Sequence, residues 1–144
     1  MSKEQIDLAA DHGGFALKQC VSKDIRTAGF DVLDLGTDSE ESVDYPDFAE
    51  KLVEAIKNNT VARGVLVCGT GIGISIAANR HPGIRAALCY DEETAMLARQ
   101  HNNANILCLG GRKTTPDEAQ RMVSIFLETE FEGGRHARRV GKLG

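Results

Sequence analysis

The sequence has no long apolar run and no excess of positive charge. No stretch approaches the ~20 apolar residues that a helix needs to cross a bilayer, and the N-terminus leads into a strand-like segment without a signal-peptide pattern. Its 17 lysines and arginines are outnumbered by 21 acidic residues, so the net charge is −4, whereas nucleic acids and membrane surfaces favour a basic face. These absences predict a soluble, cytoplasmic protein with no nucleic-acid or membrane partner.

The sequence also lacks the cysteine spacings of metal and disulfide sites. Its four cysteines form no CxxC pair, and no His/Cys spacing suits zinc. Cys20, Cys89 and Cys108 lie in apolar segments typical of a core, whereas Cys68 ends a strand-like segment. We therefore expect a reduced protein without a metal site, which agrees with a cytoplasmic location.

Strand-like and helical segments alternate along the chain, with no internal repeat and no low-complexity linker. A length of 144 residues fits one domain, residues 1–144, with a single core. The expected strands are 6–10, 32–35, 64–68, 86–89 and 106–109, and the expected helices are 15–28, 45–57, 74–79, 92–100 and 116–128. Strands that are apolar throughout suit a parallel sheet covered on both faces. The pattern predicts an α/β fold: a three-layer α/β/α sandwich, Rossmann-like, with a five-stranded parallel sheet and a C-terminal extension.

A polar or glycine-rich segment follows each expected strand. These segments are Asp11-His12, the loop from Gly36 to Asp44-Tyr45, Cys68–Gly73, Tyr90-Asp91 and Gly110-Gly111-Arg112. Ligands of such sheets bind at the carboxyl ends of the strands, around a topological switch point. The sequence therefore predicts a ligand site at that edge of the sheet.

The turn Cys68-Gly-Thr-Gly-Ile-Gly-Ile-Ser75 carries the strongest local signal. Alternating glycines let the backbone approach a ligand and direct several N–H groups at one point, beside the N-terminus of a helix. Such a nest binds a phosphate or an oxyanion such as an enediolate, and the same helix end would stabilise a Cys68 thiolate as a base or nucleophile. A purely structural or phosphate-binding turn with an inert Cys68 explains the local sequence equally well.

Two other uses of this turn fit less well. A dinucleotide fingerprint needs glycine where Ile74 stands, and a Walker motif needs a Gly-Lys pair that the turn lacks. Asp91 follows the next strand, where a ribose-binding acid would sit, so a nucleotide-binding domain is kept as an alternative. A thiol redox role is disfavoured because Cys68 has no CxxC partner.

His101 stands in the polar segment His101-Asn-Asn-Ala-Asn105 before the fifth strand. A histidine there could move protons near neutral pH, and the asparagine amides could bind sugar hydroxyls. On position alone, a helix C-cap with asparagines in left-handed turns is the stronger explanation. For Asp11-His12 the choice is a helix N-cap or a ligand contact, and the position at a strand end favours the ligand.

The basic tail, residues 133–144, is the other unusual segment. Residues 133–142 hold four lysines and arginines and no acid, a run that is by default a solvated, disordered tail. Arg135 and Arg139 are four apart, so on a helix they would face the same way and could clamp one phosphate. The Gly133-Gly134 hinge suggests a segment that leaves the body and docks elsewhere, on a partner subunit for example.

Taken together, these motifs resemble those of the ribose-5-phosphate isomerase B family, which also includes the subunits of galactose-6-phosphate isomerase. In chain order they are Asp11-His12-Gly-Gly, Asp44-Tyr45-Pro46, Cys68-Gly-Thr-Gly-Ile-Gly-Ile-Ser-Ile-Ala-Ala-Asn79, Gly83-Ile-Arg-Ala86, Arg99-Gln-His-Asn102 and Glu132-Gly-Gly-Arg-His136. The likeness covers nearly the whole chain.

The resemblance implies an enzyme that interconverts ribose 5-phosphate and ribulose 5-phosphate in the non-oxidative pentose phosphate pathway. The reaction would pass through a cis-enediolate without metal or cofactor, and allose or galactose 6-phosphate is the alternative substrate. The resemblance further implies a homodimer, or a dimer of dimers, with active sites shared between subunits.

The resemblance also assigns roles to residues. Cys68 would be the base that moves the proton between C1 and C2, His101 would open the furanose ring, and Thr70 with the turn amides would stabilise the enediolate. Some family members replace the cysteine and use an acidic residue further along the loop; this chain has Cys68, and Ser75 at the later position. The implied substrate contacts are Asp11, His12, Tyr45, Gly69, Gly71, Ile72, Gly73, Ser75, Asn102, Arg112, Arg135 and Arg139.

Overall fold

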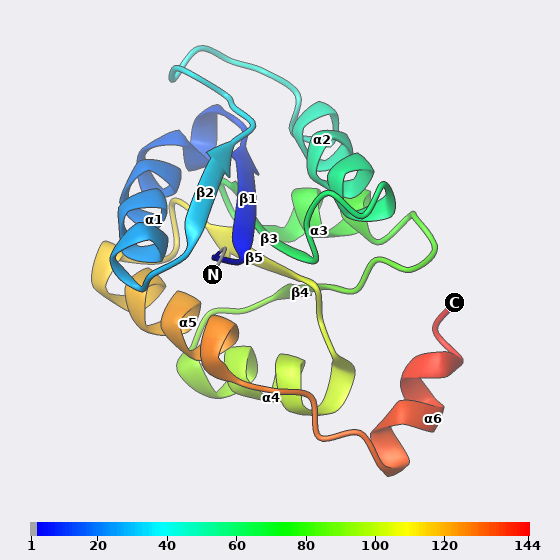
Figure 1. The fold of residues 1–144 in the computed structure, drawn as a ribbon. Helices are drawn as coiled ribbons and strands as arrows, with labels where there is room; N and C mark the ends of the chain where they lie inside the picture. The colour runs from blue at the N-terminus through cyan, green and yellow to red at the C-terminus, as the bar shows by residue number, and fades with distance from the viewer. Residues whose placement is uncertain (1–2) are drawn as a thin grey trace.

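The computed structural model describes residues 3–144 and shows the predicted three-layer α/β/α sandwich (Figure 1). The strands are β1 (Gln5–Ala10), β2 (Asp31–Asp34), β3 (Arg63–Cys68), β4 (Ala86–Leu88) and β5 (Ile106–Gly110). The helices are η1 (His12–Gly14), α1 (Phe15–Thr27), α2 (Tyr45–Lys57), α3 (Ile72–Ala78), α4 (Glu92–Asn102), α5 (Pro116–Glu128) and α6 (Arg135–Gly141). The α/β class and the five-stranded parallel sheet agree with the sequence prediction.

All strand pairs are parallel, in the order β2-β1-β3-β5-β4. After β1 the chain adds β2 on one side and then crosses to add β3 on the other, so the winding direction reverses between β1 and β3. Loops that leave neighbouring strands at such a switch point diverge and open a crevice. The pairing of Cys68 with Gly110 places the ends of β3 and β5 side by side at the same edge.

The core lies on both faces of the sheet. Side chains of α1, α4 and α5 pack on one face, and those of α2 and α3 pack on the other. Figure 1 shows these two groups of helices on opposite sides of the sheet. The expectation of strands covered on both faces is met by the central strands β1, β3 and β5, which are almost entirely buried. The expectation is wrong for the edge strand β2, whose two aspartates are exposed, because one side of an edge strand faces solvent.

The helix starts follow local sequence signals. Thr115 and Glu118 form a capping box at the start of α5, and Pro46 lies in the first turn of α2. Helix α3 begins two residues earlier than the 74–79 expected, because Gly71 adopts the left-handed conformation (φ +82°) and caps it. No helix within residues 3–144 has both the length and the apolarity to span a membrane.

The basic tail is helical, so the prediction of a disordered segment is wrong. Residues 135–141 form α6, which lies apart from the sandwich in Figure 1 and contacts the body at α4. Gly133 and Gly134 have positive φ angles (+70° and +55°) and turn the chain away from the body. Arg135 and Arg139 are exposed and lie one helical turn apart, as the four-residue spacing requires.

Candidate active site

The turn after β3 holds the Cys68 sulfur against a main-chain amide. Cys68 is 4% exposed, and the Gly71 N–H donates to its Sγ at 3.2 Å. A Cβ on Gly71 would lie 2.6 Å from Leu88 Cδ1, and φ there is +82°. Only glycine meets both conditions without strain, so this glycine fixes the amide that faces the sulfur.

The main-chain N–H that contacts its sulfur distinguishes Cys68 from the other strand cysteines, Cys89 and Cys108. Burial raises the pKa of the Cys89 thiol, and burial raises the pKa of Cys108 well above its ordinary value. Both thiols therefore stay protonated in the core. Among residues 3–144, Cys68 is the cysteine whose sulfur accepts a main-chain N–H, a contact that stabilises a thiolate.

Thr70 and Ser75 hold the turn in shape. Thr70 Oγ1 accepts the Ile72 N–H at 3.1 Å, and the Thr70 carbonyl accepts the Tyr90 hydroxyl at 2.7 Å. The buried Ser75 hydroxyl donates to the Ile72 carbonyl at 2.7 Å. The hydrogen of Ser75 is therefore committed to the first turn of α3, while its predicted substrate contact stays a prediction.

The Arg112 side chain covers the switch point between β1 and β3. A Cβ on Gly69 would lie 3.0 Å from Arg112 Nη1, and a Cβ on Gly13 would lie 3.4 Å from Arg112 Cζ. The guanidinium thus rests on two glycine backbones, close to the Cys68 turn. Within residues 3–144 this exposed side chain makes no ion pair or hydrogen bond, so its charge is available to an anion.

His12 and Tyr45 form the other wall of this site. The Val43 N–H donates to His12 Nδ1 at 3.1 Å, which leaves a neutral His12 with its proton on Nε2. The Tyr45 ring lies against Gly73, where a Cβ would be 2.7 Å from Tyr45 Cζ. A groove of about 490 Å³ runs between them, lined by Asp11, His12, Ser42, Val43, Asp44, Tyr45, Pro46 and Asp47.

Asp11 and Asp91 act as helix caps in this structure. The buried Asp11 accepts the Gly14 N–H through Oδ1 at 3.2 Å, which is one of the two roles the sequence left open. Asp91 accepts the Thr94 N–H at 2.8 Å, and that hydrogen bond lowers the pKa of Asp91. This cap accounts for Asp91 without a ribose and so weakens the nucleotide-binding alternative.

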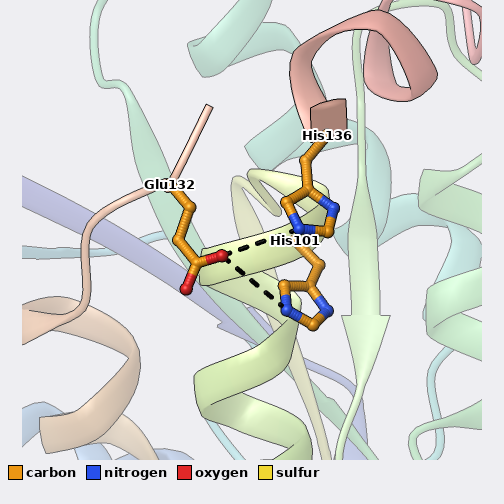
Figure 2. A group of neighbouring side chains, drawn as sticks. All are labelled: His101, Glu132 and His136. Carbon is orange, nitrogen blue, oxygen red and sulfur yellow. Dashed lines mark ion pairs between the residues drawn. The ribbon is translucent and has the colours of Figure 1, made fainter. Parts of the chain in front are cut away.

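A second group of polar side chains lies at the end of α4. The His101 and His136 rings are stacked, with centroids 4.2 Å apart and planes 10° from parallel. Glu132 Oε1 lies 3.9 Å from His101 Nε2 and 3.6 Å from His136 Nε2. Dashed lines mark these two ion pairs in Figure 2. Helix α6 supplies His136 and also carries the exposed Arg135 and Arg139.

The asparagines after His101 have mainly structural tasks. Asn103 adopts the left-handed conformation (φ +47°) and caps α4, as the helix C-cap explanation requires. Buried Asn105 accepts the Arg85 N–H at 2.8 Å and donates to the Gly83 carbonyl at 2.9 Å. Asn102 is exposed and is thus the asparagine of the three that is placed to meet a ligand.

The Cys68 group and the His101 group lie at opposite ends of the strands, the first at the carboxyl ends and the second at the amino ends. Helix α4 starts at the carboxyl edge and runs back along the strands for 11 residues, about 16 Å at the usual helical rise. It ends near Asn105, whose carbonyl accepts the N–H of Gly64 at the start of β3. A single chain therefore does not bring His101 to Cys68.

Three residues of these groups had no role assigned from the sequence: Tyr90, Glu132 and His136. Tyr90 follows β4, and its position at a strand end was the available signal. Glu132 and His136 are the first and last residues of the motif Glu132-Gly-Gly-Arg-His136, which resembles the isomerase family. Their proximity to His101, however, depends on how α6 folds back on α4.

The chain matches the ribose/galactose isomerase family over residues 6–143. A probable ribose-5-phosphate isomerase B of Mycoplasma pneumoniae is 47% identical over 139 residues, which is 96% of this chain and 91% of the relative. The solved structure of ribose-5-phosphate isomerase B from Thermotoga maritima is 53% identical, with a TM-score of 0.95 over 97% of each chain. The Clostridium thermocellum structure is 51% identical, with a TM-score of 0.95 over 97% of this chain and 95% of its own. This chain belongs to the ribose/galactose isomerase family.

Proposed function

We propose that this chain is a ribose-5-phosphate isomerase, which interconverts D-ribose 5-phosphate and D-ribulose 5-phosphate through a cis-enediolate. The observation that carries the proposal is the Cys68 sulfur held by the Gly71 amide at 3.2 Å, with the unpaired Arg112 guanidinium beside the same turn. Relatives that are 47–53% identical are named as this isomerase. A base and an anion site at one point are what this reaction needs.

Cys68 acts as the base in the proposed mechanism. In the aldose-to-ketose direction its thiolate takes the proton from C2 of the open-chain aldehyde, and the electron pair moves to the carbonyl oxygen to give the enediolate. The thiol then returns the proton to C1, while a proton passes from O2 to O1 and the ketone forms at C2. The amides of Gly69 and Gly73, together with Thr70, stabilise the negative oxygen, while the Gly71 and Ile72 N–H groups hold the Cys68 sulfur and Thr70 Oγ1.

Cations and polar groups around the crevice bind the rest of the substrate. Arg112 and His12, from the same edge as Cys68, are assigned to the phosphate-bearing end with Arg135 and Arg139. Asp11 and Asn102 are assigned to sugar oxygens, and Tyr45 forms the wall above Gly73. Ser75 is kept in the contact set through the lone pairs of its hydroxyl oxygen.

A homodimer, or a dimer of dimers, completes the proposed site. His101 and the α6 arginines lie at the opposite edge from Cys68, so a second copy must supply them to the same substrate. The exposure of Arg135 and Arg139 on a helix that leaves the body supports this arrangement. A two-fold pair makes two such sites at once.

The cellular setting follows from the same proposal. All four cysteines are free, which agrees with a reducing compartment, and we assign the enzyme to the cytoplasm and to the non-oxidative pentose phosphate pathway. No metal or cofactor takes part in the proposed steps. Allose or galactose 6-phosphate is the second candidate substrate, because the groove of about 490 Å³ beside His12 is open to a longer sugar.

Substitution of Cys68 tests the function. We expect Cys68→Ser to lower kcat for ribose 5-phosphate at least about 100-fold, because a hydroxyl is a far weaker acid–base group than a thiol. Cys20→Ser is the matched control, since Cys20 lies in α1 outside the site, and it should keep wild-type turnover. Turnover near the wild-type rate in Cys68→Ser would contradict the assigned base, and an assay across five- and six-carbon aldose phosphates identifies the substrate.

A further inference from the structure

His101, Glu132 and His136 form a compact unit built from three separate segments. His101 lies in the last turn of α4, Glu132 lies in the loop after α5, and His136 lies in the first turn of α6 (Figure 2). The stacked rings are 4.2 Å apart, and both Nε2 atoms are within 4 Å of one carboxylate oxygen. The assigned role of His101 does not by itself account for the other two residues.

The two histidines differ in their exposure to solvent. The His136 side chain is 10% exposed, whereas the His101 side chain is 38% exposed. Burial lowers the pKa of His136, and the neighbouring His101, Arg135 and Arg139 lower it further against the opposing effect of Glu132. His136 is therefore the buried, neutral platform, and His101 is the outward ring that can meet a substrate.

The parallel stack fits proton chemistry better than a shared metal ion. Two histidines on one metal must direct in-plane lone pairs at a single point about 2 Å from each nitrogen. Rings that are 10° from parallel and 4.2 Å apart direct those lone pairs side by side. The Glu132 carboxylate lies beyond hydrogen-bond distance of both Nε2 atoms, at 3.6 and 3.9 Å, but its negative charge favours a proton on the nitrogen that faces it.

We propose that His136 and Glu132 are positioning residues for ring opening by His101, an inference that rests on the proposed function. Stacking on His136 fixes the plane of the His101 ring. The negative charge of Glu132, 3.9 Å from His101 Nε2, favours the proton on that nitrogen, so Nδ1 is the atom that exchanges protons with the sugar. In ring opening Nδ1 takes the proton of the anomeric hydroxyl and gives a proton to the ring oxygen; the bond from C1 to the ring oxygen breaks, and the C1 aldehyde forms.

The two directions of the reaction separate this role from a general structural one. Ribose 5-phosphate is mainly a furanose and must be opened. Ribulose 5-phosphate stays open, because the C5 oxygen that would close its ring carries the phosphate. The reverse reaction can release the open aldehyde, which cyclises in solution. A defect in ring opening therefore slows the forward reaction, whereas a defect at Cys68 slows both.

The experiment measures kcat in both directions for His136→Ala, His136→Phe and Glu132→Gln. We expect His136→Ala and Glu132→Gln to lower forward kcat about tenfold or more, with reverse initial rates within about twofold of the wild type. His136→Phe keeps an aromatic platform and should restore most of the forward rate lost in His136→Ala. His81→Ala is the matched control, because His81 also pairs with a glutamate, Glu50, at 2.6 Å but lies outside this unit.

The outcomes distinguish the inference from the function beneath it. Equal losses in the two directions, no loss in His136→Ala, or a forward rate in His136→Phe as low as in His136→Ala would overturn the positioning role. Circular dichroism of each variant separates these results from a failure to fold, and Glu132→Gln supplies a test that leaves the stack intact. Absence of wild-type turnover in both directions would overturn the proposed function, and the inference with it.

Discussion

Substitution of Gly71 by alanine tests whether the turn around Cys68 has the geometry described above. The residue has φ +82°, and a Cβ there would lie 2.6 Å from Leu88 Cδ1 and 2.9 Å from the carbonyl carbon of Leu109. A left-handed alanine costs about 1 to 2 kcal/mol relative to glycine. Forcing a methyl group into a packed site costs about 1 to 3 kcal/mol more.

Gly83→Ala separates these two costs. Gly83 has almost the same φ, +83°, but a Cβ there meets nothing within 4 Å. The control therefore includes the backbone cost without the clash. For a chain of this length 1 kcal/mol corresponds to roughly 3 °C in Tm, so Gly71→Ala should melt roughly 3 to 10 °C below Gly83→Ala.

Thermal and urea unfolding followed by circular dichroism measure the difference, and the isomerase assay measures its consequence. Since the Gly71 N–H contacts the Cys68 sulfur, Gly71→Ala should also lose turnover, whereas Gly83→Ala should keep it. Equal melting temperatures in the two variants would refute the packing described at Leu88 and Leu109. Full activity in a destabilised Gly71→Ala would refute the role of the amide.

The remaining predictions concern the basic helix and a buried acid. Arg135→Ala and Arg139→Ala should each raise the KM for the sugar phosphate about tenfold with a smaller change in kcat, because a charge-assisted phosphate contact is lost. Arg138→Ala on the same helix is the control. Unchanged kinetics in Arg135→Ala and Arg139→Ala would indicate that α6 is only solvated. Burial raises the pKa of Asp7 above its ordinary 3.8, so the folded chain binds this proton more tightly than the unfolded chain, and the free energy of unfolding falls as pH rises from 3.8 through the folded pKa. Asp7→Asn should remove this pH dependence of the free energy of unfolding, measured by urea titrations, and should stabilise the protein at pH 7 by about 1 kcal/mol. A free energy of unfolding that falls more steeply with pH in Asp7→Asn than in the wild type would contradict this prediction.

The sequence was sufficient to predict the strands, most of the helices, and the end of the sheet that carries the Cys68 turn. Apolar runs such as Val65–Val67 are local signals, and the parallel topology places every strand end at one edge. The sequence could not supply the strand order, because nothing local records that β5 lies between β3 and β4. The contact of Arg112 with Gly13 and Gly69 depends on the long-range pairing of β3 with β5.

The prediction failed where stability comes from contacts rather than local pattern. Residues 135–141 have no apolar stripe, and helices this short are marginal alone, so a disordered tail was the natural expectation. In the structure, buried His136 packs on His101 and ties this short helix to α4. An arginine-rich sequence does not reveal that contact, although it does reveal the charge that α6 carries.

The fold places the Cys68 turn and the His101 group at opposite ends of the strands, and this separation determines how the active site can be completed. Proton transfer between C1 and C2 and opening of the ring act on neighbouring atoms of one sugar, so both acid–base groups must come within hydrogen-bond reach of it. Helix α4, 11 residues long, holds His101 about 16 Å along the sheet from the edge that bears Cys68. No side-chain rotation spans that distance. We therefore propose that a second copy supplies His101 to the same substrate, and the exposed helix α6, whose His136 stacks on His101, is the part of this chain that we expect to meet that copy.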